Sequence, residues 1–239
     1  MIAADGAPRP ALEVIDLLLR DREAMLARIR KGNDVAAIMR TMIATIAVCM
    51  AIVGAALGSY RGGVQIAYAA IKLPIVLLGT AALSAPALSA IGAALGRRSR
   101  LSADLALVMA SLAFGALLLA ACAPLLMVGR ALELDYHRMI LATVAVFAIA
   151  GLAALRMVWR GVALEAAPGW RTAVAGLCLV FSLVGGQLSW ALRPYLVRPR
   201  TPEVPFVREV EGSLFDAVTQ AFRSARGIYD RDAAPLGER

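Results

Sequence analysis

The stretch AIKLPIVLLGTAALSAPALSAIGAALG, residues 70–96, decides the fold class of this chain. No charged residue lies between Lys72 and Arg97. A bilayer core of roughly 30 Å is crossed by about 20 helical residues, so the stretch is long enough to span a membrane. Because backbone groups in hydrocarbon must pair within their own segment, it is expected to be a helix and not a strand.

Four more uncharged runs share this character, and they cover residues 41–60, 105–129, 139–155 and 172–192. The whole chain is 60% apolar and 18% charged, with a mean hydropathy of +0.73. Soluble domains carry about 25% charged residues, so this composition favours a membrane protein. The sequence therefore predicts an all-α integral membrane bundle of five transmembrane helices.

The opening stretch also holds a charge and two prolines. Lys72 precedes the uncharged run, where its ammonium is expected to reach the headgroups while its stem lies on apolar surface. Pro74 is expected in the first turn of the helix, where a missing N–H costs nothing. Pro86 lies in mid-span, so we expect it to kink or locally unwind the second transmembrane helix.

Small residues recur at four-residue spacing in the first two spans. Gly54 and Gly58 form one such pair, and Gly92 and Gly96 form another. Glycines at this spacing let two helix backbones approach closely in a membrane. We expect all four to be helix-packing positions, with Pro86 on the same packed helix.

The segments outside the spans predict amphipathic helices at both ends. Residues 11–31 place apolar side chains at steps of three and four, and Gly32 follows as a stop signal. This helix is expected to lie along the headgroups or to dock a partner. Four prolines between 194 and 205 precede a second short helix that Ser213 would cap. The expected division is therefore 1–38, a bundle over 39–193, and 194–239.

The positive charge of the connecting segments predicts the orientation. With a cytoplasmic N-terminus, thirteen Lys and Arg residues fall on the cytoplasmic side, against four on the other side before the tail. Positive charge accumulates in cytoplasmic loops, so we expect a cytoplasmic N-terminus and a periplasmic C-terminus in the bacterial inner membrane. The net charge of +8 is explained by these flanks and by lipid headgroups, without nucleic acid as a partner.

Polar chemistry within the spans is sparse. Gln187 and Ser182 are expected to be buried polar groups that bond a neighbouring helix, and Trp190 to lie at the membrane interface with Lys72. Glu133, Asp135 and the sole histidine, His137, lie together in one connecting segment. One histidine without a nearby cysteine is a poor metal site, and no nucleophile accompanies it. We expect no enzyme, no metal and no cofactor.

The order of these features resembles a known layout. The segments LLRDREAMLARI, IKLP, GGQLSWALRPYL and PFVREVEGSLFDAV follow one another as in a group of bacterial five-span inner-membrane proteins whose activity is uncharacterised. More distantly, five spans after a cytosolic N-terminus are similar to the Yip1-type layout, whose members organise membranes without known catalysis. The resemblance implies a membrane organiser.

The sequence leaves two principal functions open, and a third, a membrane enzyme that uses Glu133, Asp135 and His137, ranks behind both. The first is a non-catalytic membrane subunit or scaffold that packs with lipid, with a partner membrane protein or with its own copies. The alternative is a transporter or lipid-handling component in which the break at Pro86 and the amide of Gln187 line a path.

Overall fold

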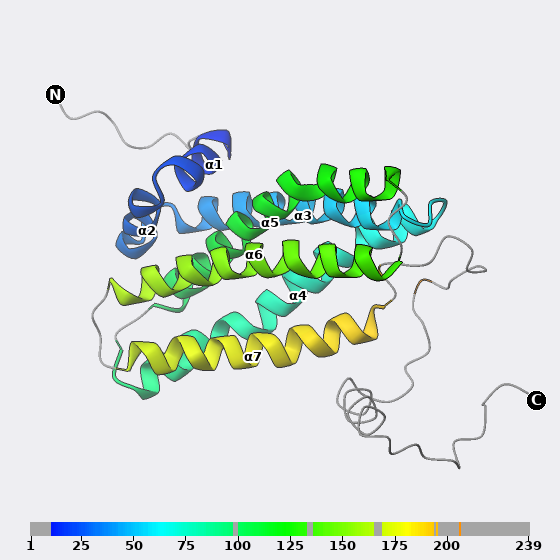
Figure 1. Ribbon diagram of the computed structural model, residues 1–239. Coiled ribbons are helices and arrows are strands. Elements are labelled where there is room, and N and C mark those ends of the chain that lie inside the picture. The colour runs from blue at the N-terminus through cyan, green and yellow to red at the C-terminus, as the bar shows by residue number, and fades with distance from the viewer. Residues whose placement is uncertain are drawn as a thin grey trace, which may run out of the picture.

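The molecule is a bundle of helices. The computed structural model describes residues 11–97, 100–132, 136–164, 169–193, 195 and 206, and within these ranges the secondary structure consists of seven helices without a strand. Five helices are long and apolar enough to cross a membrane (Figure 1), which confirms the predicted fold class. The segment around Ser213, and the side chains of Glu133, Asp135 and His137, lie outside the described residues.

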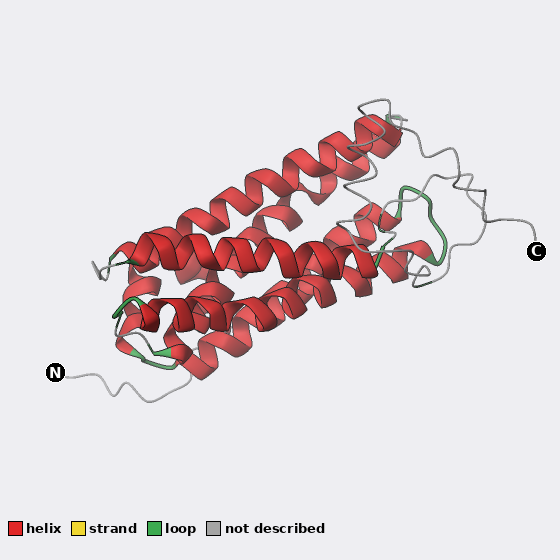
Figure 2. Cartoon of the chain, turned by 90° about the horizontal axis from the view of Figure 1, so that it is seen from below, coloured by secondary structure: helices red, strands yellow, loops and turns green. Residues whose placement is uncertain are grey.

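The long helices extend past the uncharged runs that predicted them. They are α3 (Val35–Gly58), α4 (Gln65–Ala94), α5 (Leu101–Ala131), α6 (Tyr136–Ala163) and α7 (Trp170–Ala191). At 1.5 Å per residue, the 30 residues of α4 measure about 45 Å, which exceeds a hydrocarbon core of roughly 30 Å. The helix ends therefore reach beyond the apolar layer, and the connections lie at the two ends of the bundle (Figure 2).

The five helices are buried to different degrees. In α3 and α5 the most apolar window is 56% and 61% buried, whereas in α6 and α7 it is 17% buried. The helix α4 packs between α3 and α7, while α6 leans mainly on α5 and has only a short contact with α7. The centre of the bundle is thus α3 and α5, and α6 and α7 present most of their apolar surface to the outside.

The amphipathic N-terminal region forms two helices, α1 (Ala11–Arg20) and α2 (Arg22–Lys31), and not the single helix expected over 11–31. The break has a local cause: the Asp21 side chain accepts a hydrogen bond from the Ala24 N–H (2.9 Å), which caps α2. Gly32 ends α2 in the left-handed conformation, as expected.

The apolar faces of α1 and α2 pack on the bundle itself. Leu18 of α1 and Met25, Leu26 and Ile29 of α2 are buried. Both helices contact α5, and they cross one end of the bundle (Figure 1). Their main docking surface is therefore the protein's own core, although Leu12 remains 77% exposed.

The prolines of α4 behave differently from the prediction. The helix begins at Gln65, nine residues before Pro74, so Pro74 lies in the helix interior and not in the first turn. The helix also continues through Pro86 without interruption, so of the two expected effects local unwinding does not occur, and Pro86 itself is exposed and is not a packing position. One proline removes one backbone hydrogen bond, and the packing of α4 between α3 and α7 is sufficient to keep the remaining turns helical.

The two glycine pairs have different roles. A Cβ on Gly54 would overlap the carbonyl of Ala69, and one on Gly58 would overlap the carbonyl of Gln65, so both glycines lie directly against the α4 backbone. The pair at 92 and 96 is not a packing ladder, which corrects the prediction. Gly96 follows the end of α4 with φ +83°, and Gly92 lies beneath the side chain of Arg97.

Candidate functional site

A buried ion pair joins the end of α4 to the start of α5. Arg97, 4% exposed, donates through Nη2 to Asp104 Oδ1 (2.7 Å) and through Nη1 to Oδ2 (3.2 Å). Asp104 is 2% exposed, and its Oδ2 also accepts a hydrogen bond from Ser89 Oγ (2.6 Å). Gly92 leaves the space that the arginine stem occupies. Because these three hydrogen bonds join residues from the end of α4 and the connection after it to the first turn of α5, the charge cluster closes the α4–α5 corner and has a structural role.

Sequence reasoning missed this pair. Neither Asp104 nor Arg97 was among the residues predicted to form a site. The available clue was the presence of opposite charges seven residues apart across a short connection. Two helices joined by so few residues are antiparallel neighbours, which brings such residues together.

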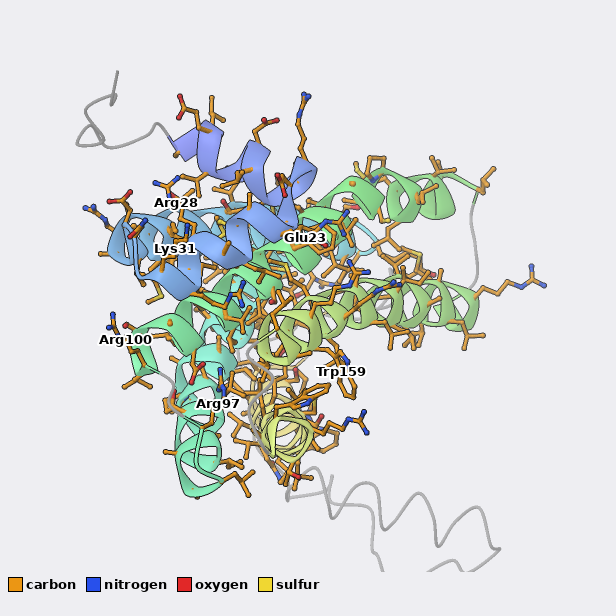
Figure 3. All side chains as sticks on the ribbon, turned by 90° about the vertical axis from the view of Figure 1, so that its left-hand side faces the viewer. Glu23, Arg28, Lys31, Arg97, Arg100 and Trp159 are labelled. Carbon is orange, nitrogen blue, oxygen red and sulfur yellow. The ribbon has the colours of Figure 1, made fainter. Side chains whose placement is uncertain are left out.

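Cationic side chains gather at the end of the bundle that carries α2. Arg28, Lys31, Arg97 and Arg100 lie there in Figure 3. Arg28 pairs with Asp34 (2.6 Å), and Arg30 donates to the Leu164 carbonyl at 3.3 Å.

A groove opens between α2, α5 and α6 at the same end, with a cavity volume of about 500 Å³. The charged residues that line it are Arg22, Glu23, Arg156 and Arg160. The apolar ones are Leu26, Phe114, Leu152, Ala153 and Met157.

A second groove lies between α6 and α7, with α5 as its floor and a volume of about 280 Å³. Small side chains are frequent in its lining, including Ser111, Gly151, Ala154, Cys178 and Ser182. A Cβ on Gly151 would meet no atom within 4 Å, so this glycine faces open space. The groove exists because α6 and α7 each lean on a different neighbour and barely touch each other.

The opposite end of the bundle is organised around the first turns of α4. Lys72 is fully buried, which corrects the expected solvent-reaching position, and its Nζ lies 5.0 Å from the centre of the Phe206 ring. Tyr68 packs edge-on against the same ring at 5.1 Å. About 10 Å separate Lys72 from the start of α4, so it lies near the membrane boundary but beneath the protein's own chain.

Tyr195, four residues after the end of α7, makes hydrogen bonds at the same end of the bundle. Gln65 Nε2 donates to the Tyr195 carbonyl (3.3 Å), and the Tyr195 hydroxyl donates to the Ser189 carbonyl (3.0 Å). Burial raises the pKa of Tyr195 to about 12. Trp190 lies one residue before the end of α7, with the Arg193 guanidinium carbon 3.5 Å from its ring centre.

The polar residues expected deep in α7 are not buried. Ser182 is exposed and Gln187 is only half-buried, because α7 is a peripheral helix with one packed face. Two buried hydroxyls on α4, Thr80 Oγ1 and Ser84 Oγ, are enclosed and have no hydrogen-bond partner among the residues that the structure describes. The hydropathy pattern of the sequence could not identify these two residues, because Ser and Thr occur at packed helix faces in the same positions as Gly and Ala.

Metal-ligating side chains do not cluster in the part of the chain that the structure describes, since no three His, Cys, Asp or Glu residues there could hold an ion. The three cysteines are unpaired, with Cys49 buried and Cys122 and Cys178 half-buried. Burial among apolar helices is the ordinary environment of a free cysteine.

Comparison with known proteins identifies no relative. No protein-family model matches the chain, and neither a curated protein nor a solved structure is significantly similar to it. The likeness to Yip1-type and bacterial five-span proteins therefore stays a prediction. Five helices that are long and apolar enough to cross a bilayer indicate a multi-pass membrane protein.

Proposed function

We propose that this protein is a non-catalytic membrane subunit, a scaffold that receives a transmembrane helix of a partner between α6 and α7. The observation that supports this function is the groove on α5, which Gly151, Ala154 and Ser182 line with small side chains. The space beside Gly151 is open, whereas the space beside Gly54 is occupied by the backbone of α4.

The chemistry of the groove suits a helix better than a polar solute. Its lining is dominated by apolar and small residues, and the Ser111 hydroxyl already donates to the Leu107 carbonyl (2.8 Å). Small residues allow close backbone approach, which is the main source of helix affinity in lipid. The lining of α7 runs from Leu177 to Ser182, about 8 Å along the axis, so it offers roughly one and a half turns of contact.

A site-specific photocrosslinker tests this proposal in intact membranes. Placed at Ser182, inside the groove, it should give a discrete protein adduct. Placed at Leu179, which is 62% exposed on α7, it should give lipid adducts only. Gly151→Leu should abolish the Ser182 adduct because the new side chain fills the groove, and Ala145→Leu on the exposed face of α6 should leave it unchanged.

The outcomes separate the possible occupants. An adduct of twice the chain mass identifies the partner as a second copy. Lipid adducts alone at both positions mean that the groove holds acyl chains, which contradicts the scaffold proposal. An adduct that survives Gly151→Leu means that the partner binds elsewhere.

Transport is a second candidate, and the buried hydroxyls of Thr80 and Ser84 favour it. They lie one turn apart on α4, and Thr80 faces Gly185 of α7, where a Cβ would be 3.1 Å from Thr80 Cγ2. An enclosed hydroxyl without a partner is costly unless it serves a solute or a water.

A double variant distinguishes the two functions. In a scaffold, Thr80→Val with Ser84→Ala removes unsatisfied groups and should leave thermal stability and cellular phenotype unchanged or improved. In a transporter, the same change should abolish the phenotype at normal protein levels. Gln187→Leu is the companion variant on α7, and it should lower phenotype only in proportion to protein level if the scaffold proposal holds.

The orientation in the membrane belongs to the same proposal. A reporter fused after Arg239 should be active only in the periplasm, and one placed at Arg98 only in the cytoplasm, because basic residues gather on the side that carries α1 and α2. The opposite pattern would place that end outside the cell.

A further inference from the structure

We propose that the groove between α2, α5 and α6 binds the headgroup of an anionic phospholipid. The groove has a volume of about 500 Å³, and its charged lining consists of Arg22, Arg156 and Arg160 with Glu23. Three guanidinium groups against one carboxylate leave a net positive charge at this point of the surface. Phosphate is the anion for which the planar, forked guanidinium is best suited.

Two arginines near the end of α6, Arg156 and Arg160, are available to an external anion. Arg156 and Arg160 are one helical turn apart, so both project over the same part of the groove. Among the residues that the structure describes, neither guanidinium group takes part in an ion pair or hydrogen bond. In this respect they differ from Arg97, whose charge Asp104 neutralises.

The third arginine, Arg22, reaches the groove from α2, on the side opposite α6. Arg22 is the first residue of α2, directly after the capping Asp21. Its guanidinium carbon lies 4.8 Å from the centre of the Phe114 ring on α5. The aromatic face holds the cation over the groove and reduces the freedom that it would lose on binding.

The apolar part of the groove favours a lipid over a soluble phosphate. Leu152 lines the groove and is 66% exposed, and Ile149, nearly one turn further into the membrane, is also 66% exposed. An acyl chain that runs along these residues would continue directly from a phosphate held by Arg156. The site also lies near the end of α6, about 10 Å from its last residue, where headgroups are found.

This site is separate from the groove of the proposed function. Residues 151, 154, 155 and 158 of α6 line the groove toward α7, whereas residues 152, 153, 156, 157 and 160 line the groove toward α2. The two therefore occupy different faces of α6, and either can fail without the other.

Spin-labelled lipids measure the preference directly. The full-length protein is reconstituted in phosphatidylcholine, and the relative association constants of spin-labelled phosphatidylglycerol and phosphatidylcholine are compared. We expect the wild type to prefer phosphatidylglycerol. Arg156→Gln with Arg160→Gln should reduce that preference about 25-fold, or to parity if it starts lower, since each basic residue near a charged surface contributes roughly fivefold.

Two variants control the measurement. Arg171→Gln removes an exposed arginine at the start of α7, on the same membrane side, and should leave the preference nearly unchanged. Arg156→Lys with Arg160→Lys keeps the charge and should retain most of the preference. The melting temperature of every variant is measured first, so that loss of fold is distinguished from loss of binding.

Three results would overturn the proposal. The first is an equal affinity of the wild type for both lipids. The second is an equal loss in Arg171→Gln and in the α6 double variant, which would indicate diffuse surface charge. The third is full competition by inorganic phosphate at millimolar levels, which would indicate a site for a small soluble anion.

Discussion

Asp104→Asn should be one of the most destabilising single substitutions in this protein. The aspartate carboxylate accepts hydrogen bonds from Ser89 Oγ (2.6 Å), Arg97 Nη2 (2.7 Å) and Arg97 Nη1 (3.2 Å), and both charged residues are almost completely buried. The amide is nearly isosteric, so the variant removes the negative charge without opening a cavity. Arg97 then stays buried without a counter-charge.

The magnitude follows from that geometry. Hydrogen bonds to charged groups contribute about 1.5–3 kcal/mol each, and two of them join Arg97 to Asp104. Removing one member of a buried ion pair costs about 3–5 kcal/mol, which agrees with that sum. For a chain of this size, such a loss lowers the melting temperature by about 6–20 °C.

Thermal denaturation in mild detergent provides the assay, with Asp16→Asn as the matched control. Asp16 pairs with Arg20 at 2.6 Å, but both side chains are exposed, so the control should lose less than about 1 kcal/mol. A second variant, Arg97→Met with Asp104→Leu, removes both charges and should recover most of the lost stability. The reasoning is refuted if Asp104→Asn melts like Asp16→Asn, or if the double variant is no more stable than Asp104→Asn.

Three further predictions concern packing, capping and ionisation. Gly54→Ala should destabilise the bundle by about 1–3 kcal/mol because its Cβ overlaps the Ala69 carbonyl, whereas Gly151→Ala should be neutral or slightly stabilising; equal melting temperatures would contradict this. Asp21→Ala should cost about 1 kcal/mol and increase hydrogen exchange in α2, and unchanged exchange would exclude the capping role. Tyr195 should ionise near pH 12, as read by ultraviolet absorbance. Since the unfolded phenol ionises near pH 10, stability should fall between pH 10 and 12, and Tyr195→Phe should remove that part of the fall.

The sequence by itself determined the fold class and the number of spans. Five uncharged runs predict five transmembrane helices, because a charge in hydrocarbon is costly and a helix pairs its own backbone groups there. The same local physics predicted that α2 ends at Gly32, where a left-handed residue is required. Gly54 and Gly58 were recognised as packing positions from their spacing, and the structure places both against α4.

Tertiary structure decided which residues of a given pattern contact another helix. Gly92 and Gly96 have the same spacing as Gly54 and Gly58, yet one pair lies against a helix and the other accommodates Arg97 and ends α4. Lys72 was expected to reach the headgroups, yet it is buried because other segments of the chain cover it, and Asp104 next to a span is buried in the same way. Burial depends on which helices become neighbours, and spacing along one helix carries no information on the residues that another helix brings to it.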